Sequence, residues 1–171
     1  IRVISPATSL AVISPDTREI AIENLKKIGF YVTFSKNAEE CNLFSSSSIE
    51  SRVADIHEAF FDLNVKGILT TLGGFNSNQL LRYLDYEIIA SNPKILCGYS
   101  DITAITTAIY SKTGMVTYSG PHFSTFGMRK GLEYTIEAFQ ICLVENTPYV
   151  IETSKEWSDD PWYQDQENRI F

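Results

Sequence analysis

Short, continuously apolar segments alternate along the chain with longer segments in which apolar residues recur every three or four positions. The short segments are rich in β-branched and aromatic residues, which is typical of buried strands, and they cover 1–4, 30–34, 67–72, 94–97 and 115–118. The longer segments predict amphipathic helices over about 15–28, 48–63, 76–84, 102–112 and 132–144. This alternation predicts an α/β fold in which a mainly parallel sheet carries helices on both faces.

Polar and glycine residues mark the ends of the predicted helices. Ser14 followed by Pro15 predicts the start of the first helix, and Gly29 predicts its end. Ser47 with Glu50 three residues later forms a capping box for the second helix. The same reasoning predicts an apolar face of Val53, Ile56, Phe60 and Leu63, a third helix capped by Asn76 and Gln79 that carries Leu80, Leu81 and Leu84, and a stop at Gly114.

The pattern changes after about Val150. Residues 151–171 hold both tryptophans, Trp157 and Trp162, with six acids, two bases and no clear periodicity. We therefore predict a nucleophile-bearing domain over 1–150, followed by a linker and the beginning of a second domain over 151–171. Because strand-like residues begin at Ile1 and no stop signal precedes Phe171, we expect a chain cut at both ends.

Composition and charge exclude several classes of protein. The 44% hydrophobic content is enough to form a core, while the net charge of −7 argues against nucleic-acid polymers or anionic membranes as partners. No run of about 18 apolar residues occurs. The three cysteines, Cys41, Cys97 and Cys142, lack zinc-site spacing and are interpreted as reduced thiols of a cytoplasmic protein. We expect no metal and no cofactor.

Two strand-to-helix turns are candidate sites, since ligands of parallel sheets bind at the carboxyl ends of strands. In the first turn, Gly73 and Gly74 let a ligand approach the backbone and expose peptide N–H groups, with Asn76 close by. A tight turn that needs positive φ is an equally good interpretation of the two glycines. The turn lacks the spacing of a phosphate-binding loop.

The second turn, 98–101, places Ser100 between a strand and a helix. It resembles a nucleophile elbow, in which a small residue two positions earlier, here Gly98, relieves crowding. The second glycine of that pattern is replaced by Ile102, so a simple helix N-cap remains an alternative. As nucleophile, Ser100 would have an oxyanion hole formed by the N–H groups of Asp101 and of Gly73 or Gly74.

The general base is harder to find. His57 lies in the middle of a predicted helix and is interpreted as a packed or surface residue. His122 follows the strand 115–118, and we interpret it as a pocket wall rather than the base. The Asp101 side chain is next to Ser100 in sequence and is poorly suited to orient a histidine that contacts Ser100.

Three motifs in order, Leu72–Asn78, Gly98–Thr103 and Tyr118–Phe123, resemble the serine peptidases of the LD-carboxypeptidase family, S66. The closing segment 157–162 is most similar to the branch named for microcin C immunity. The resemblance implies a Rossmann-like N-terminal domain with Ser100 as nucleophile and Asp101 and Gly74 as oxyanion hole. It also implies that the Glu and His of the triad belong to a C-terminal domain, because they have no counterpart here.

The resemblance further implies a small substrate without metal or cofactor. We expect cleavage of an amide-type bond in a peptidyl-nucleotide, with murein tetrapeptide carboxypeptidase activity as an alternative. A non-catalytic small-ligand module is a third possibility, and a homodimer is a candidate assembly. The candidate substrate contacts are Gly73, Asn76, His122, Trp157 and Trp162; the two tryptophans either stack on a nucleobase or pack a domain junction.

Overall fold

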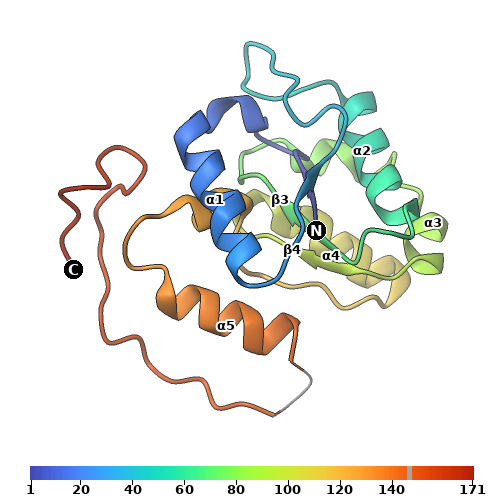
Figure 1. Ribbon diagram of the computed structural model, residues 1–171. Coiled ribbons are helices and arrows are strands. Elements are labelled where there is room, and N and C mark those ends of the chain that lie inside the picture. The colour runs from blue at the N-terminus through green and yellow to red at the C-terminus, as the bar shows by residue number, and fades with distance from the viewer. Residues whose placement is uncertain (146–147) are drawn as a thin grey trace.

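A computed structural model of the protein describes residues 1–145 and 148–171. Its centre is a four-stranded sheet in the order β2-β1-β3-β4, and all three strand pairings are parallel (Figure 1). The strands are β1 (Arg2–Ile4), β2 (Thr33–Phe34), β3 (Gly67–Thr70) and β4 (Ile95–Cys97). The predicted parallel α/β architecture is confirmed.

Side chains alternate between the two faces of the sheet along each strand. Ile4, Ile68 and Leu96 belong to one buried cluster, and their neighbours Val3, Leu69 and Cys97 belong to the other. The first cluster is covered by α2 (Ile49–Phe61), α3 (Tyr86–Ser91) and α4 (Thr103–Thr113). The second is covered by α1 (Pro15–Lys27), α5 (Glu133–Leu143) and the 3-10 helix η4 (Phe123–Gly127) (Figure 1).

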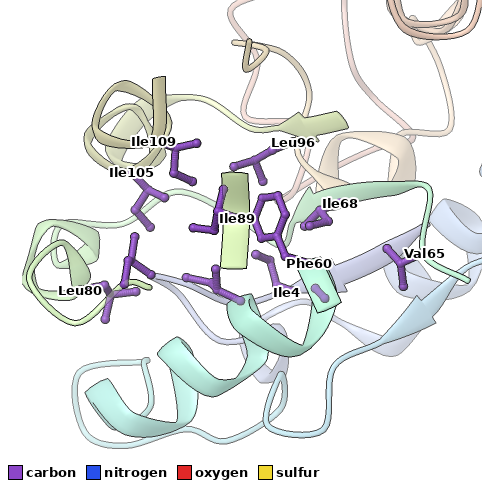
Figure 2. Packing of buried hydrophobic residues seen from close by; sticks show 12 residues of the cluster. Ile4, Phe60, Val65, Ile68, Leu80, Ile89, Leu96, Ile105 and Ile109 are labelled. Carbon is purple, nitrogen blue, oxygen red and sulfur yellow. The ribbon is translucent and has the colours of Figure 1, made fainter. Parts of the chain in front are cut away.

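The first of these clusters packs side chains of α2, α3 and α4 against the strands. Figure 2 shows Phe60 of α2 beside Ile4 and Ile68 of the strands, with Ile105 and Ile109 of α4 on the other side of Ile89. Burial of this apolar surface is the main stabilising contribution to the fold. Together with the second cluster on the opposite face, this packing fixes the sheet, and the sheet in turn positions the loops at its carboxyl edge.

The first helix begins and ends as predicted. The hydroxyl oxygen of Ser14 accepts from the N–H of Thr17, and Pro15 occupies the first helical position. Gly29 follows the helix with a φ of +94°, in the left-handed region that favours glycine.

The second helix differs from the prediction at both ends. Its N-cap is Ser48, which accepts from the N–H of Ser51, so the predicted capping box at Ser47 is wrong by one residue. The helix ends at Phe61, because Asp62 leaves the helical conformation and its carboxylate accepts from the N–H of Asn64. Leu63 falls in that turn and is 76% exposed, so it does not belong to the apolar face.

The predicted helix over 76–84 is wrong. Only the short 3-10 helix η2 (Ser77–Leu80) forms there, because the backbone hydrogen bonds join residues three positions apart, as from Gln79 to Asn76 and from Tyr83 to Leu80. Asp101 accepts from the N–H groups of Asn76 and Ser77 at its start. Asn76 makes no side-chain cap, and the Gln79 side chain accepts from Arg52. The short helix α3 that follows was not predicted; its N-cap is Asp85, which accepts from the N–H groups of residues 87 and 88.

Three of the remaining strand segments are shorter than predicted, and one helix begins earlier. The segment 115–118 forms only one bridge, Cys97 to Tyr118, and Val116 is 61% exposed, so it is not a full strand. The segment 30–34 pairs only at β2, and β3 stops at Thr70. The helix predicted from Ile102 begins as the 3-10 helix η3 (Ser100–Ile102) and continues as α4, with Gly114 as its left-handed cap.

After α5, the described residues 148–171 contain turns but no helix or strand. This segment contacts the region that follows η4, where Gln166 accepts from the N–H of Arg129 and donates to the carbonyl of Gly127. Within the described ranges, no helix combines the length and apolar character needed to cross a membrane.

Candidate active site

Three turns converge at the carboxyl edge of the sheet, after β3, after β4 and after the bridge at Tyr118. The N–H of Ser124 donates to the carbonyl of Thr71, which ties the third turn to the first. The N–H of Thr8, which follows β1, donates to the carbonyl of Gly73. The sheet order places β1, β3 and β4 side by side, so these loops share one edge where ligands of parallel sheets bind.

Ser100 has a strained backbone. Its φ is +60°, in the left-handed region, which costs a residue with a side chain about 1–3 kcal/mol. The only other such non-glycine residue among those described is Ser45, in a surface loop, so positive φ alone does not mark a site. Ser100 differs because it lies in the turn between β4 and the following helix and is exposed, as a nucleophile elbow requires.

The alternative of a simple N-cap is wrong. η3 begins at Ser100 itself, with Tyr99 in the cap position, and neither η3 nor α4 receives a side-chain cap. The Ser100 hydroxyl has no hydrogen-bond partner within the described residues, so it is free for another role.

Two glycines leave space around this turn. A Cβ on Gly98 would lie 2.3 Å from Thr70 Oγ1, so only glycine fits two positions before Ser100. A Cβ on Gly73 would lie 3.1 Å from both Cβ and Oγ of Ser100. The first glycine therefore allows the sharp turn, and the second keeps the space beside the hydroxyl open.

Asp101 joins the two loops. Its Oδ2 accepts from the N–H groups of Asn76 (3.0 Å) and Ser77 (2.9 Å), and its carbonyl accepts from the Ser77 hydroxyl at 2.7 Å. Two of these bonds occupy the Oδ2 atom of the carboxylate. Within the described residues, neither the N–H of Asp101 nor that of Gly74 donates a hydrogen bond, so both remain available to a ligand oxygen.

His122 lies beside Ser100 and beneath an aromatic ring. Its Nδ1 is 2.7 Å from Thr70 Oγ1, and its ring stacks on Tyr99 with centroids 4.3 Å apart. A Cβ on Gly73 would lie 3.6 Å from its Nε2. Burial lowers the pKa of His122 from 6.5 to about 4, so the ring is neutral at neutral pH.

His57 is used elsewhere. Its Nε2 accepts from the N–H of Asp85 at 2.8 Å, which links α2 to the start of α3. Burial lowers the pKa of His57 as well, although Asp85 acts in the opposite direction. The interpretation of His57 as a packed residue agrees with this contact.

Two residues near the site were not singled out from the sequence. Arg52 is buried and donates to the carbonyls of Pro6 (3.1 Å) and Asn76 (3.2 Å), so it fixes both neighbouring loops. An arginine on the core side of an amphipathic helix was a sequence feature that could have indicated this. Thr70, at the end of β3, had no such feature, because a threonine is ordinary in a strand.

The structure brings together Ser100, Asp101, Gly73, Gly74, Asn76 and His122, as the sequence predicted. It does not bring the tryptophans to them: Trp157 is 74% exposed, and Trp162 is half-buried with its ring 6.1 Å from that of Tyr163. Within the described part of the chain, no contact between either tryptophan and Ser100 is found, and their role in substrate binding stays a prediction.

This geometry has known counterparts. A family model of the LD-carboxypeptidase N-terminal domain of peptidase family S66 matches residues 1–120. The chain belongs to peptidase family S66. It is 63% identical to YocD of Bacillus subtilis over 171 residues, which cover 100% of this chain and 53% of YocD.

Solved structures of family S66 agree with the fold. An MccF-like protein of Bacillus anthracis has 63% identity and a TM-score of 0.98, covering 99% of this chain and 52% of that one. The microcin C7 self-immunity protein MccF of Escherichia coli is 36% identical over 156 residues, covering 88% of this chain and 44% of MccF. Its complex with aspartyl sulfamoyl adenosine gives a TM-score of 0.88 at 32% identity, covering 99% and 51% of the two chains. The S66 chain thus spans about half the length of the curated relatives it matches.

Proposed function

We propose that this chain is the nucleophile-bearing part of a serine hydrolase and that Ser100 is its nucleophile. The observation that carries the proposal is the left-handed Ser100, exposed after β4, with Gly98 and Gly73 leaving space around it. Strain of this kind persists only where the surroundings enforce it, and it is typical of functional sites. Membership of family S66 supports the same role.

In the proposed reaction, Ser100 Oγ attacks the carbonyl carbon of an amide-type bond and gives its proton to a base. The tetrahedral oxyanion accepts from the free N–H groups of Asp101 and Gly74, at the start of η3 and in the glycine turn. Collapse breaks the C–N bond, the protonated amine leaves, and water hydrolyses the acyl-enzyme.

We infer that the base comes from outside this chain. His57 Nε2 is occupied by the N–H of Asp85, and His122, with its pKa near 4, is a weak base. The Glu and His implied by the family resemblance would complete the triad from a C-terminal domain. The chain by itself is then expected to be inactive, with 1–150 as the N-terminal domain and 151–171 as the entry to the next.

For the substrate, we propose a peptidyl-nucleotide cleaved in a self-immunity reaction. The relative MccF has been solved with aspartyl sulfamoyl adenosine, which combines an amino-acyl group with a nucleoside. Trp157 and Trp162 would supply the flat surface on which a base stacks. The three cysteines are all free, which supports a reducing, cytoplasmic location, and a homodimer is the proposed assembly.

The test compares Ser100→Ala with Ser119→Ala in the full-length protein. Both serines are exposed at the same edge of the sheet, so Ser119 is a matched control. Hydrolysis of aspartyl sulfamoyl adenosine should fall by about three orders of magnitude or more in Ser100→Ala and stay near wild type in Ser119→Ala. Wild-type turnover in Ser100→Ala would overturn the proposal.

Three further measurements separate the proposed hydrolase from murein carboxypeptidase activity and from a pure binding module. Release of D-alanine from murein tetrapeptide, without turnover of the sulfamoyl nucleoside, would assign the protein to carboxypeptidase activity instead. A fluorophosphonate adduct on Ser100 would exclude a pure binding module. Ligand binding by the full-length protein without an adduct or turnover would favour such a module.

A further inference from the structure

His122 is a buried histidine with only one of its two ring nitrogens paired. It is 1% exposed, and its Nδ1 contacts the Thr70 hydroxyl, whereas Nε2 has no partner within the described residues. A buried polar atom without a partner costs about 1–3 kcal/mol. Native proteins rarely keep such an atom without a reason.

The Thr70 hydroxyl can either donate to His122 Nδ1 or accept from it, and the direction of this bond sets which ring nitrogen carries the proton. The Thr70 side chain is fully buried, and Nδ1 is the acceptor found for its hydroxyl proton among the described residues. A hydroxyl that donates to Nδ1 leaves the proton of a neutral imidazole on Nε2. With Thr70 as the donor, His122 presents an N–H group at the nitrogen that lacks a partner.

This donor faces the space beside Ser100. The point where Gly73 lacks a Cβ is 3.6 Å from His122 Nε2 and 3.1 Å from Ser100 Oγ. Gly73 has only a hydrogen atom at this point, so His122 Nε2 and Ser100 Oγ border the same small gap. Tyr99, stacked on the ring with an interplanar angle of 28°, holds the imidazole in this orientation.

We propose that His122 Nε2–H donates a hydrogen bond to the Ser100 hydroxyl oxygen and orients the nucleophile, with Thr70 fixing the tautomer. The proposal rests on the role of Ser100 proposed above. His122 and Thr70 are then positioning residues.

The hydrogen bond leaves the chemistry of Ser100 intact. A hydroxyl oxygen has one proton to donate and two lone pairs. One lone pair accepts from Nε2–H, the proton goes to the base, and the other lone pair attacks the carbonyl carbon. No proton moves between His122 and Ser100. The same donor stabilises Oγ when the acyl-enzyme ester is cleaved and the oxygen leaves.

The tautomer can be measured directly in this chain, because it has only two histidines. Long-range ¹H–¹⁵N correlation spectra at neutral pH should show His122 protonated on Nε2. His57 is an internal control with the opposite expectation, since its Nε2 accepts from Asp85 and its proton must be on Nδ1. The variant His57→Gln assigns the signals. A His122 ring protonated on Nδ1 overturns the proposal and leaves the role of Ser100 untouched.

The functional test uses Thr70→Val, Thr70→Ser and His122→Phe in the full-length protein. Valine keeps the shape of threonine without the hydroxyl, serine keeps the hydroxyl, and phenylalanine keeps the stacking. We expect kcat and the rate of fluorophosphonate labelling to fall roughly tenfold or more in Thr70→Val and His122→Phe, with KM little changed. Thr70→Ser should stay near wild type.

The outcomes distinguish this proposal from a structural role and from the proposed function. If His122→Phe is folded, shown by its Tm, and labels at the wild-type rate, His122 only packs and the proposal is wrong. If the variants do not fold, the tautomer measurement in the unaltered chain decides. Active Ser100→Ala would instead refute the proposed function itself.

Discussion

Gly98 lies against Thr70 so closely that a Cβ on Gly98 would be 2.3 Å from the Thr70 hydroxyl oxygen. Gly98→Ala should therefore destabilise the protein by about 1–3 kcal/mol in urea unfolding, because neither backbone can move easily. Gly67→Ala is the control, since its new Cβ would meet nothing closer than 3.8 Å. Adding Thr70→Ala to Gly98→Ala should recover part of the loss. Equal stability of the two glycine variants would contradict the close contact.

Asp101 holds two backbone N–H groups of the glycine turn. Asp101→Ala leaves both without their acceptor and should cost about 1–3 kcal/mol in thermal or urea unfolding. Asp101→Asn keeps a side-chain oxygen and should cost less. In the full-length protein, Asp101→Ala should also slow fluorophosphonate labelling of Ser100. A labelling rate equal to wild type in Asp101→Ala would show that the turn does not need this carboxylate.

Two neighbouring serines at the start of α2, Ser47 and Ser48, provide a test of which residue caps the helix. Ser48 caps the helix, so Ser48→Ala should lower the free energy of unfolding by about 1 kcal/mol. Ser47 makes no hydrogen bond through its hydroxyl within the described residues, and Ser47→Ala should stay within about 0.5 kcal/mol of wild type. Urea unfolding of the two variants side by side measures the difference, and the reverse order would restore the sequence-based capping box.

His122 should make stability depend on pH. The pKa of His122 is about 4 in the folded chain, against its ordinary value of 6.5, which applies to the unfolded chain. As pH falls, the unfolded chain therefore binds the proton first. The stabilising contribution of neutral His122 is complete above the pKa of the unfolded chain, and it is lost as pH decreases toward the pKa of the folded chain. Between about pH 7.5 and about pH 5 the loss is about 2 kcal/mol.

The control for this effect is His122→Phe, which cannot take up the proton. Carboxylates such as Asp62 also lose stabilising contacts in acid, but they do so equally in both proteins. Urea unfolding at the two pH values should therefore show a steeper decrease in wild type. Parallel decreases would mean that His122 is protonated as easily in the folded chain as in the unfolded chain.

The sequence predicted the architecture well, because it depends on patterns that burial enforces. The apolar segments that form β1, β3 and β4 and the Ser14-Pro15 start of α1 are local features of the sequence. Both are found in the structure. The motif residues around Ser100 also came together, because parallel strands bring their carboxyl ends to one edge.

What the sequence could not predict depends on contacts between distant residues. The segment 76–84 forms only the 3-10 helix η2, and the acceptor for the N–H groups at its start is Asp101, which lies far along the chain. The pairing of Thr70 with His122 joins residues 52 positions apart and follows no local pattern. That Ser100 does not cap its helix became visible only from the backbone, because the residue type fixes neither φ nor the residue at which η3 begins.

The Asp101 carboxylate has a wider consequence. Since Asp101 directly follows Ser100 and accepts hydrogen bonds from the neighbouring loop, the proposed nucleophile and the proposed oxyanion-hole donors lie on two loops that are bonded to each other without any substrate. In the proposed function, a second domain would have one task left, to supply a base beside Ser100. Exchange of that domain would alter which substrate enters without disturbing the contacts of Asp101.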